Sequence, residues 1–413
     1  MAYSKYSIIQ GTDDSGAIIP IAVDSLANLA IDVKGPTSAY GEVLSLASTV
    51  TSQTHFSYNT INNQIAIPAT YATGSVTASN GMVLCSTGAG AAGAGTLSSS
   101  KLLQCIYGYG GQCRFVAMFS APATLSNQIA GLGNATDALC FGYNGTSFGI
   151  LWRHAGTSVW IPQASWNIDP MLGSGPSKQT LVPTNLNVFK IRYQSAAGAI
   201  KFYIEDKSDG SLAPVHVIEY ANANTSLSLS IPSFPFIFQA VNIGNTSNLT
   251  VSVAAFSMAV EGMPVYTGPK FSFDAFRSVN AGINNILSLQ VGATFNGIPS
   301  RVQIKIRHVS LATDNNSSGI CSLRIIKNGT PSSAFTFNPI DTNNSAVGTS
   351  TQSVTVSGGI SLWTTVIALR DANQIVDLTD FDVYANAGDV LSFCATNTNT
   401  AIIAVAVNWS EGQ

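Results

Sequence analysis

Short runs of β-branched and aromatic residues, separated by clusters of Gly, Asn, Ser and Pro, recur along almost the whole chain. Examples are residues 114–120 (RFVAMFS), 188–193 (VFKIRY) and 302–307 (VQIKIR). No long segment has the 3.6-residue hydrophobic period of an amphipathic helix, and Glu, a good helix former, occurs only five times in 413 residues. Runs of this kind at this spacing are typical of β-sandwiches. The sequence therefore predicts an all-β protein.

Residues 190–206 (KIRYQSAAGAIKFYIED) contain the clearest local signal of this kind. Two alternating runs flank a Ser-Ala-Ala-Gly turn, which predicts a β-hairpin. Alternation places Arg192 and Lys201 on polar faces, and Ile191 and Phe202 on apolar faces.

A chain of 413 residues is too long for one compact core, so we expect several domains. Residues 1–80 show few paired strands and are interpreted as an N-terminal arm or docking region. Residues 81–263 form a first sandwich, and residues 264–269 (PVYTGP) a linker rich in proline. Residues 270–413 contain enough strands for a jelly roll. The predicted architecture is an N-terminal arm plus two antiparallel β-sandwich, jelly-roll-like domains.

The amino-acid composition limits the kinds of partner that the protein can bind. Charged residues make up 9% of the chain, against roughly 25% in an average soluble domain. The hydrophobic content of 46% argues against disorder. A surface of small neutral polar groups suits packing against copies of the same chain, so we expect self-association. The net charge of −3, without a basic run, argues against nucleic-acid binding and against attraction to anionic membranes.

Compartment and thiol chemistry follow from two further features. No apolar stretch is long enough to span a bilayer, and the N-terminus has no signal-peptide pattern. The six cysteines are widely spaced without a CxxC pair. We expect the cysteines to be buried free thiols, with a Cys105–Cys113 disulfide as the alternative, and we expect the protein to be synthesised in a cytosol.

Groups for catalysis are sparse. None of the four histidines has a metal-ligand spacing. A glycosidase would need two carboxylates across a cleft, but Glu205, Asp206 and Asp209 are more simply explained as a polar hairpin turn. The sequence predicts no catalytic residue and no enzyme.

The candidate ligand-binding residues are Trp160 and Trp166, which flank a proline-containing segment, together with His154. Exposed indoles stack on sugar rings, although loop aromatics also anchor subunit interfaces. Trp152 lies in an apolar run and is expected in the core.

Asp377, Asp380 and Asp382 (in DLTDFD) form the densest acidic segment and are a candidate calcium site, since calcium takes several oxygen ligands. The alternative is an acidic strand edge that discourages unwanted pairing. No other cofactor is indicated.

Two regions of the chain carry resemblances to known families. Residues 141–153 (FGYNGTSFGILWR) and 189–206 resemble laminin-G or concanavalin-like sandwiches. Residues 384–393 (YANAGDVLSF) resemble the jelly rolls of the complement-C1q and tumour-necrosis-factor type. The second resemblance implies a homotrimer and a turn at Gly388 and Asp389, where Gly supplies a positive φ and Asp caps the turn.

The order of segments over residues 80–413 resembles uncharacterised virion structural proteins of phages and large DNA viruses. This implies a capsid-surface, fibre or spike component, made in the host cytoplasm and assembled into the virion with copies of itself and other virion proteins. A contribution to host attachment through a surface glycan is part of the same hypothesis. The alternative is a carbohydrate-binding module or lectin-like protein.

Overall fold

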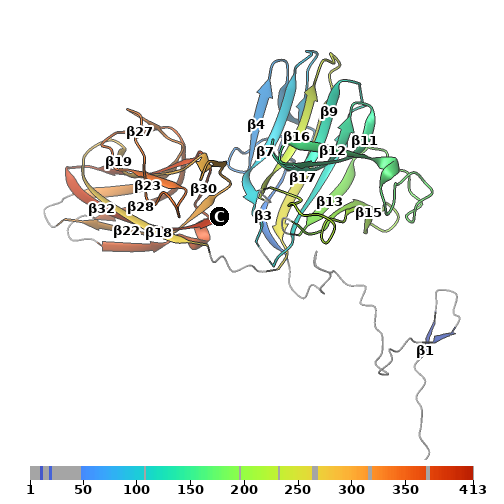
Figure 1. Cartoon of the computed structure of the whole chain (residues 1–413). Coiled ribbons are helices and arrows are strands. Elements are labelled where there is room, and N and C mark those ends of the chain that lie inside the picture. The colour runs from blue at the N-terminus through green and yellow to red at the C-terminus, as the bar shows by residue number, and fades with distance from the viewer. Residues whose placement is uncertain are drawn as a thin grey trace, which may run out of the picture.

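The computed structural model describes residues 10–12, 18–20, 48–106, 108–194, 197–230, 233–262, 268–314, 319–368 and 373–412. Within these ranges the chain forms β-strands and two 3-10 turns, η1 (Gln163–Ser165) and η2 (Thr379–Phe381), with no α-helix. Figure 1 shows two bodies of antiparallel sheets. The prediction of an all-β chain with antiparallel sandwiches is confirmed. In the described part, no helix is long and apolar enough to cross a membrane.

The first sandwich has a seven-stranded sheet in the order β12-β11-β10-β9-β16-β7-β4. Its strands are β12 (Thr157–Pro162), β11 (Ser147–His154), β10 (Ala138–Asn144), β9 (Ser126–Gly133), β16 (Phe234–Asn242), β7 (Ala94–Leu103) and β4 (Ala66–Tyr71).

The second layer of this sandwich is an eight-stranded sheet in the order β15-β14-β13-β8-β17-β6-β5, with β3 also paired to β17. Its strands are β15 (Leu212–Ile218), β14 (Ile200–Glu205), β13 (Asn187–Tyr193), β8 (Gly111–Phe119), β17 (Thr250–Val260), β6 (Met82–Ser86), β5 (Ser75–Ser79) and β3 (Thr49–His55). The predicted hairpin is β13–β14, in which Ile191 faces Phe202 and Arg192 faces Lys201.

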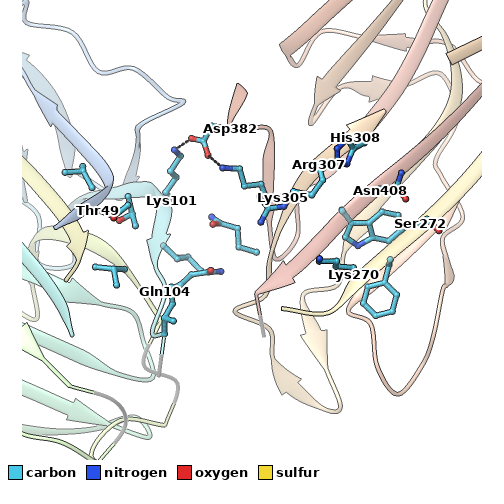
Figure 2. A pocket seen from close by; sticks show the side chains of 18 residues that line it. Thr49, Lys101, Gln104, Lys270, Ser272, Lys305, Arg307, His308, Asp382 and Asn408 are labelled. Atoms are coloured by element: carbon cyan, nitrogen blue, oxygen red, sulfur yellow. Dashed lines mark hydrogen bonds and ion pairs between the residues drawn. The ribbon is translucent and has the colours of Figure 1, made fainter. Parts of the chain in front are cut away.

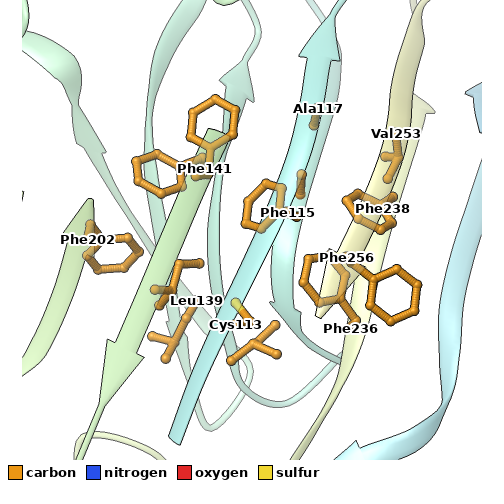
Figure 3. Close-up of a cluster of buried hydrophobic side chains, with 14 of the residues drawn as sticks. Cys113, Phe115, Ala117, Leu139, Phe141, Phe202, Phe236, Phe238, Val253 and Phe256 are labelled. Atoms are coloured by element: carbon orange, nitrogen blue, oxygen red, sulfur yellow. The ribbon is translucent and has the colours of Figure 1, made fainter. Parts of the chain in front are cut away.

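Phenylalanine rings fill the space between the two layers (Figure 3). Phe115 of β8 is 1% exposed and stacks on Phe189 at 5.2 Å between ring centroids. It also meets Phe236 and Phe238 edge-on, at 5.1 and 5.8 Å. Offset and edge-to-face pairs of this kind add stability beyond the burial of apolar area.

The boundary predicted at residue 80 differs from the structure, because β3, β4 and β5 belong to the first sandwich. Phe56 and Ala66 are buried in its core. β4 and β5 are short and mostly solvent-facing, so their apolar alternation is too weak to identify them as strands from sequence. The rest of the predicted arm lies outside the described residues, apart from β1 (Gln10–Thr12) and β2 (Ile18–Pro20), which pair with each other.

The second sandwich has one sheet in the order β18-β32-β22-β29, with β30 paired to β22, and another in the order β25-β26-β19-β31-β23-β28. The first sheet contains β18 (Lys270–Val279), β32 (Ala401–Gly412), β22 (Gln303–Thr313), β29 (Asn373–Asp377) and β30 (Tyr384–Asn386). The other contains β25 (Asn338–Pro339), β26 (Val347–Ser350), β19 (Asn284–Val291), β31 (Val390–Asn397), β23 (Ile320–Lys327) and β28 (Ile360–Ala368). Two small ribbons pair β20 (Thr294–Phe295) with β21 (Ile298–Pro299), and β24 (Thr330–Pro331) with β27 (Val356–Ser357). Of the predicted linker, residues 264–267 lie outside the described ranges.

All six cysteines are unpaired, including Cys105 and Cys113, and five of them are buried. The prediction of buried free thiols is therefore confirmed for these five. Burial raises the pKa of the Cys85 thiol to about 12 and that of Cys105 to about 11. Such thiols stay protonated, and hence poor nucleophiles, at neutral pH.

Candidate functional site

The seven-stranded sheet is apolar on both faces. One face packs into the aromatic core through residues such as Leu139 and Phe141. On the opposite face Ile129, Cys140 and Leu151 form a separate buried cluster, against which the partly exposed Trp160 packs. Antiparallel sheets with one solvated face normally alternate apolar and polar residues. An apolar outer surface on such a sheet therefore marks a candidate binding site.

Strand register arranges this outer face into rows that cross the whole sheet. The first row, from β4 to β12, consists of Ile67, Ser98, Ile237, Gly131, Cys140, Leu151 and Trp160. The second consists of Ala69, Thr96, Gln239, Ile129, Gly142, Gly149 and Pro162. The third, from β4 to β11, consists of Tyr71, Ala94, Val241, Asn127, Asn144 and Ser147. We call these three sets the outer rows.

The outer rows contain no charged side chain, and their polar groups are all hydroxyls and amides. Gln239 Nε2 donates a hydrogen bond to Thr96 Oγ1 at 3.0 Å, which orients the amide within its row. The glycines stand where neighbouring backbone approaches closely. A β-carbon at Gly142 would lie 1.9 Å from the Gln128 carbonyl oxygen, and one at Gly149 would lie 2.3 Å from that of Ile161. At Gly142 and Gly149, in the middle of the second row, the sheet therefore has backbone atoms and no side chain on this face.

Trp160 is the aromatic residue of the first outer row. It lies on the edge strand β12, opposite Leu151, and is only partly buried. An indole held against a sheet in this way offers one ring face to a ligand. Among the predicted ligand-binding residues, it is the one that the structure places on an accessible apolar surface.

Trp166 does not share this surface, so its prediction as a ligand-binding residue is wrong. The turn η1 carries the chain around the sandwich edge, and the indole enters the core with 4% exposure. Its ring meets Phe141 edge-on at 6.0 Å and Phe148 at 6.3 Å. Trp152 packs against this core as expected, and its Nε1 donates to the Ser228 carbonyl oxygen at 3.0 Å.

His154, at the end of β11, belongs to a loop contact. Its Nδ1 lies 3.6 Å from Asp137 Oδ1 and 3.4 Å from Ser230 Oγ. Asp137 is fully buried and accepts backbone hydrogen bonds from Ala155 and Ser230. The Ser230 hydroxyl and the Asp137 carboxylate both approach Nδ1 of His154. In a Ser-His-Asp triad the serine contacts one ring nitrogen and the aspartate contacts the other. This arrangement ties three loops together and does not activate the serine.

In the acidic segment, the candidate calcium site, Asp377 and Asp382 face different partners. Asp377 Oδ2 faces His308 Nε2 at 3.9 Å, while Asp382 turns towards Lys101 and Lys305. Asp382 has a left-handed φ of 53°, which directs its side chain away from the strand. Among the described residues, no group of three His, Cys, Asp or Glu side chains could hold a metal ion. Asp380 lies in η2 between the other two.

Gly388 and Asp389 form a tight turn before β31. Gly388 has a φ of 89°, and the Asp389 carboxylate accepts a hydrogen bond from the Asn386 backbone N–H at 2.9 Å. The same carboxylate pairs with Lys327 at 2.7 Å. This geometry is the one that the Gly-Asp sequence implies.

A cavity of about 1060 Å³ lies between the two sandwiches (Figure 2). Lys101 and Gln104 line it from the first sandwich, and Lys270, Lys305 and Asp382 line it from the second. Asp382 pairs with Lys101 across the cavity and with Lys305 at 3.6 Å. Tyr384 Oη also donates to the Gln64 carbonyl oxygen at 3.2 Å. Sequence reasoning missed this site, because its residues come from segments far apart in the chain.

No protein-family model and no curated protein matches the chain. Solved structures that resemble it cover about half of its length. One belongs to the endo-acting O-glycanases that human gut microbiota express to initiate mucin breakdown. It is 10% identical in sequence, the match covers 52% of this chain and 100% of that protein's chain, and the TM-score is 0.37. A β-1,3-glucanase from Mycobacterium marinum is 9% identical, covers 51% and 98%, and has a TM-score of 0.35. Peanut lectin is 11% identical, covers 52% and 98%, and has a TM-score of 0.34.

These similarities correct one prediction. The sequence predicts that the protein is not an enzyme, and this is wrong as an exclusion, because glycan hydrolases stand among the solved structures with a similar sandwich. A lectin stands among the same matches.

Proposed function

We propose that this protein recognises uncharged glycan chains on the outer rows of its seven-stranded sheet. The observation that carries the proposal is the first outer row, in which the partly exposed Trp160 and Ile237 pack against the buried cluster that includes Leu151, on the face away from the core. The second row adds the polar groups of Thr96 and Gln239, and the third row adds hydroxyls and amides at Tyr71, Asn127, Asn144 and Ser147.

The chemistry of a sugar matches both parts of this surface. One face of a pyranose ring presents C–H groups, which stack on an indole such as that of Trp160. The ring hydroxyls need neutral donors and acceptors close by, and Gln239, Thr96 and Asn127 supply them from adjacent rows. The outer rows have no charged side chain, and Arg153, in the next row of β11 on the same face, donates to Ser158 Oγ and to the Asn134 carbonyl oxygen, so the rows suit a neutral sugar better than an acidic one.

Binding to an array of neutral glycans tests the proposal. Trp160→Ala should weaken binding to the recognised glycan by at least about tenfold, since a buried aromatic contact often dominates a binding site. Tyr58→Ala is the matched control, because Tyr58 is 81% exposed and precedes β4 outside the outer rows. Equal binding by the wild type and the Trp160→Ala variant would contradict the proposal, as would failure of the wild type to bind any glycan.

Incubation with the bound glycan, followed by a reducing-end assay, tells recognition alone from recognition followed by cleavage. Glycoside hydrolysis generally uses two carboxylates, and the outer rows contain no Asp or Glu. Release of reducing ends that is lost in Trp160→Ala would make the outer rows the substrate-binding surface of a hydrolase, with its carboxylates outside these rows.

Incorporation into a virion and assembly as a homotrimer stay predictions from the sequence. Light scattering of the purified chain tests the second of them directly.

A further inference from the structure

Four basic residues form a compact block on the outer face of the eight-stranded sheet. They are Arg114 of β8, Lys190 and Arg192 of β13, and Lys201 of β14. Lys190 lies directly opposite Arg114, and Arg192 lies directly opposite Lys201. The whole chain has only 18 Lys and Arg, so this concentration on three neighbouring strands stands out. We call it the basic block.

The arrangement is unfavourable for the folded chain by itself. Like charges directly opposite each other on antiparallel strands destabilise a sheet, since their β-carbons lie only about 5 Å apart. Burial, followed by the charges of Arg192 and Arg114, lowers the pKa of Lys190 to about 8, and Glu261 opposes the shift only partly. The positive charge at this position is thus poorly compensated.

The carboxylates nearby neutralise one member of the block. Arg192 Nε and Nη2 both approach Glu261 Oε1 at 2.7 Å, and both side chains are buried. In the described ranges, no carboxylate lies within ion-pair distance of Arg114, Lys190 or Lys201. Glu205 follows on the same face of β14 without pairing to any of the three.

We propose that Arg114, Lys190 and Lys201 bind a tetrahedral oxyanion, a sulfate or phosphate group, that a ligand presents to the outer face of the eight-stranded sheet. Arginine and lysine donate charge-assisted hydrogen bonds to such groups. Tyr203, between Lys201 and Glu205 and directly opposite Lys190, has its ring centroid 6.0 Å from Lys190 Nζ. The site is independent of the outer rows, which belong to the other sheet.

The size of the block favours one such group over a nucleic-acid backbone. Neighbouring strands are about 5 Å apart, and alternate residues along a strand about 7 Å, so the long side chains of these three cations span the space that a single tetrahedral group would occupy. Nucleic-acid binding needs a longer basic surface with many phosphate contacts. The basic block does not continue along the strands, because the next residues on this face are Val116 in β8, Val188 in β13 and Glu205 in β14.

Titration calorimetry of the full chain provides the test, with inorganic sulfate, inorganic phosphate, galactose 6-sulfate and glucose 6-phosphate as ligands and galactose as the uncharged control. Arg114→Gln and Lys190→Gln should each weaken sulfate binding by about tenfold. Lys207→Gln removes the same charge from an exposed turn outside the block and should leave binding unchanged. Because neutral sugars are proposed to bind the outer rows, the sugar esters and galactose are titrated into Trp160→Ala as well. In that variant, tighter binding of the esters than of the free ions would identify an esterified ligand, and equal binding would identify the free ion; both support the site if Arg114→Gln weakens them.

A pH series separates binding from a structural role. Sulfate keeps its charge, so its affinity for the wild type should fall as pH rises through about 8, where Lys190 loses its proton. Arg114, Arg192, Lys201, Tyr203 and Glu261 surround this amine. The affinity of Lys190→Gln should show no such fall, and the ligand-free variant should unfold at or above the wild-type temperature, because a repulsion is removed. Absence of sulfate and phosphate binding in the wild type would overturn the proposal, as would unchanged binding in Arg114→Gln.

Discussion

The two sandwiches fill their interiors differently. Of the twelve largest fully buried side chains, ten belong to the first sandwich, and only Trp409 and Phe393 lie in the second. The second core is built mainly from Ile, Val, Leu and Ala. Aromatic rings interlock through specific edge-to-face contacts, whereas aliphatic chains pack through their volume and shape. The same two-layer architecture thus tolerates two ways of filling the space between sheets.

The two sandwiches also differ in the partners of their buried glutamates. In the first sandwich Glu261 is paired with the Arg192 guanidinium. In the second, Glu411 accepts hydrogen bonds from Trp409 Nε1 at 3.1 Å, from Ser345 Oγ at 2.5 Å and from the Ala346 backbone N–H at 3.0 Å. The Glu261 carboxylate faces a buried guanidinium, and the Glu411 carboxylate accepts from an indole, a hydroxyl and a backbone N–H, so their replacement should have unequal consequences.

The largest effect is expected in the aromatic core. Phe115→Ala should cost about 4 kcal/mol of the free energy of unfolding, because it removes a ring that contacts Phe189, Phe236 and Phe238 and leaves a cavity. Leu323→Ala, at a fully buried position of the second sandwich, should cost about 3 kcal/mol. Calorimetric unfolding checks both values, and a smaller loss for Phe115→Ala than for Leu323→Ala would remove the energetic distinction between the cores.

Glu261→Gln should cost about 3 kcal/mol, because it leaves the buried Arg192 guanidinium without the opposite charge of its carboxylate partner. Chemical denaturation measures the loss. A double-mutant cycle with Arg192→Met separates the ion pair from the packing of the two side chains. Full stability in the single variant would show that other contacts compensate Arg192.

Glu411→Gln should cost only about 1 kcal/mol, since an amide oxygen in the place of Oε1 still accepts from Ser345 Oγ and Trp409 Nε1 and only the bond from the Ala346 N–H is lost. The same denaturation experiment, read from the fluorescence of Trp409 in the second sandwich, gives the value. A loss as large as that of Glu261→Gln would mean that the two acids are equivalent in spite of their different partners.

The smallest effect is expected at the contact between the sandwiches. Asp382→Asn removes the ion pairs to Lys101 and Lys305, but the carboxylate is half-exposed and screened. We expect a change of about 0.5 kcal/mol or less. Calorimetry with Asp380→Asn as the matched control measures this change. A marked drop in the unfolding temperature of Asp382→Asn, without a drop for Asp380→Asn, would show that the contact couples the two sandwiches.

Sequence reasoning identified the local parts of this fold. The predicted hairpin is β13–β14, with Ile191 and Phe202 on its apolar face and Arg192 and Lys201 on its polar face as expected. The turn at Gly388 also depends on neighbouring residues alone. Trp166 shows the limit, since its burial depends on the path of η1 around the sandwich edge and not on the residues beside it.

The amino-acid sequence by itself determined the strands and their two faces, because alternation and turn chemistry act over a few residues. Only the tertiary structure decided which faces meet. The order of the strands within each sheet places Trp160 in one row with Ile237, and Arg114 beside Lys190. That order is set by pairing between distant segments, whose register depends on the packing of the whole sandwich. Both proposed binding surfaces consist of such pairings, which is why no short stretch of the sequence contains either of them.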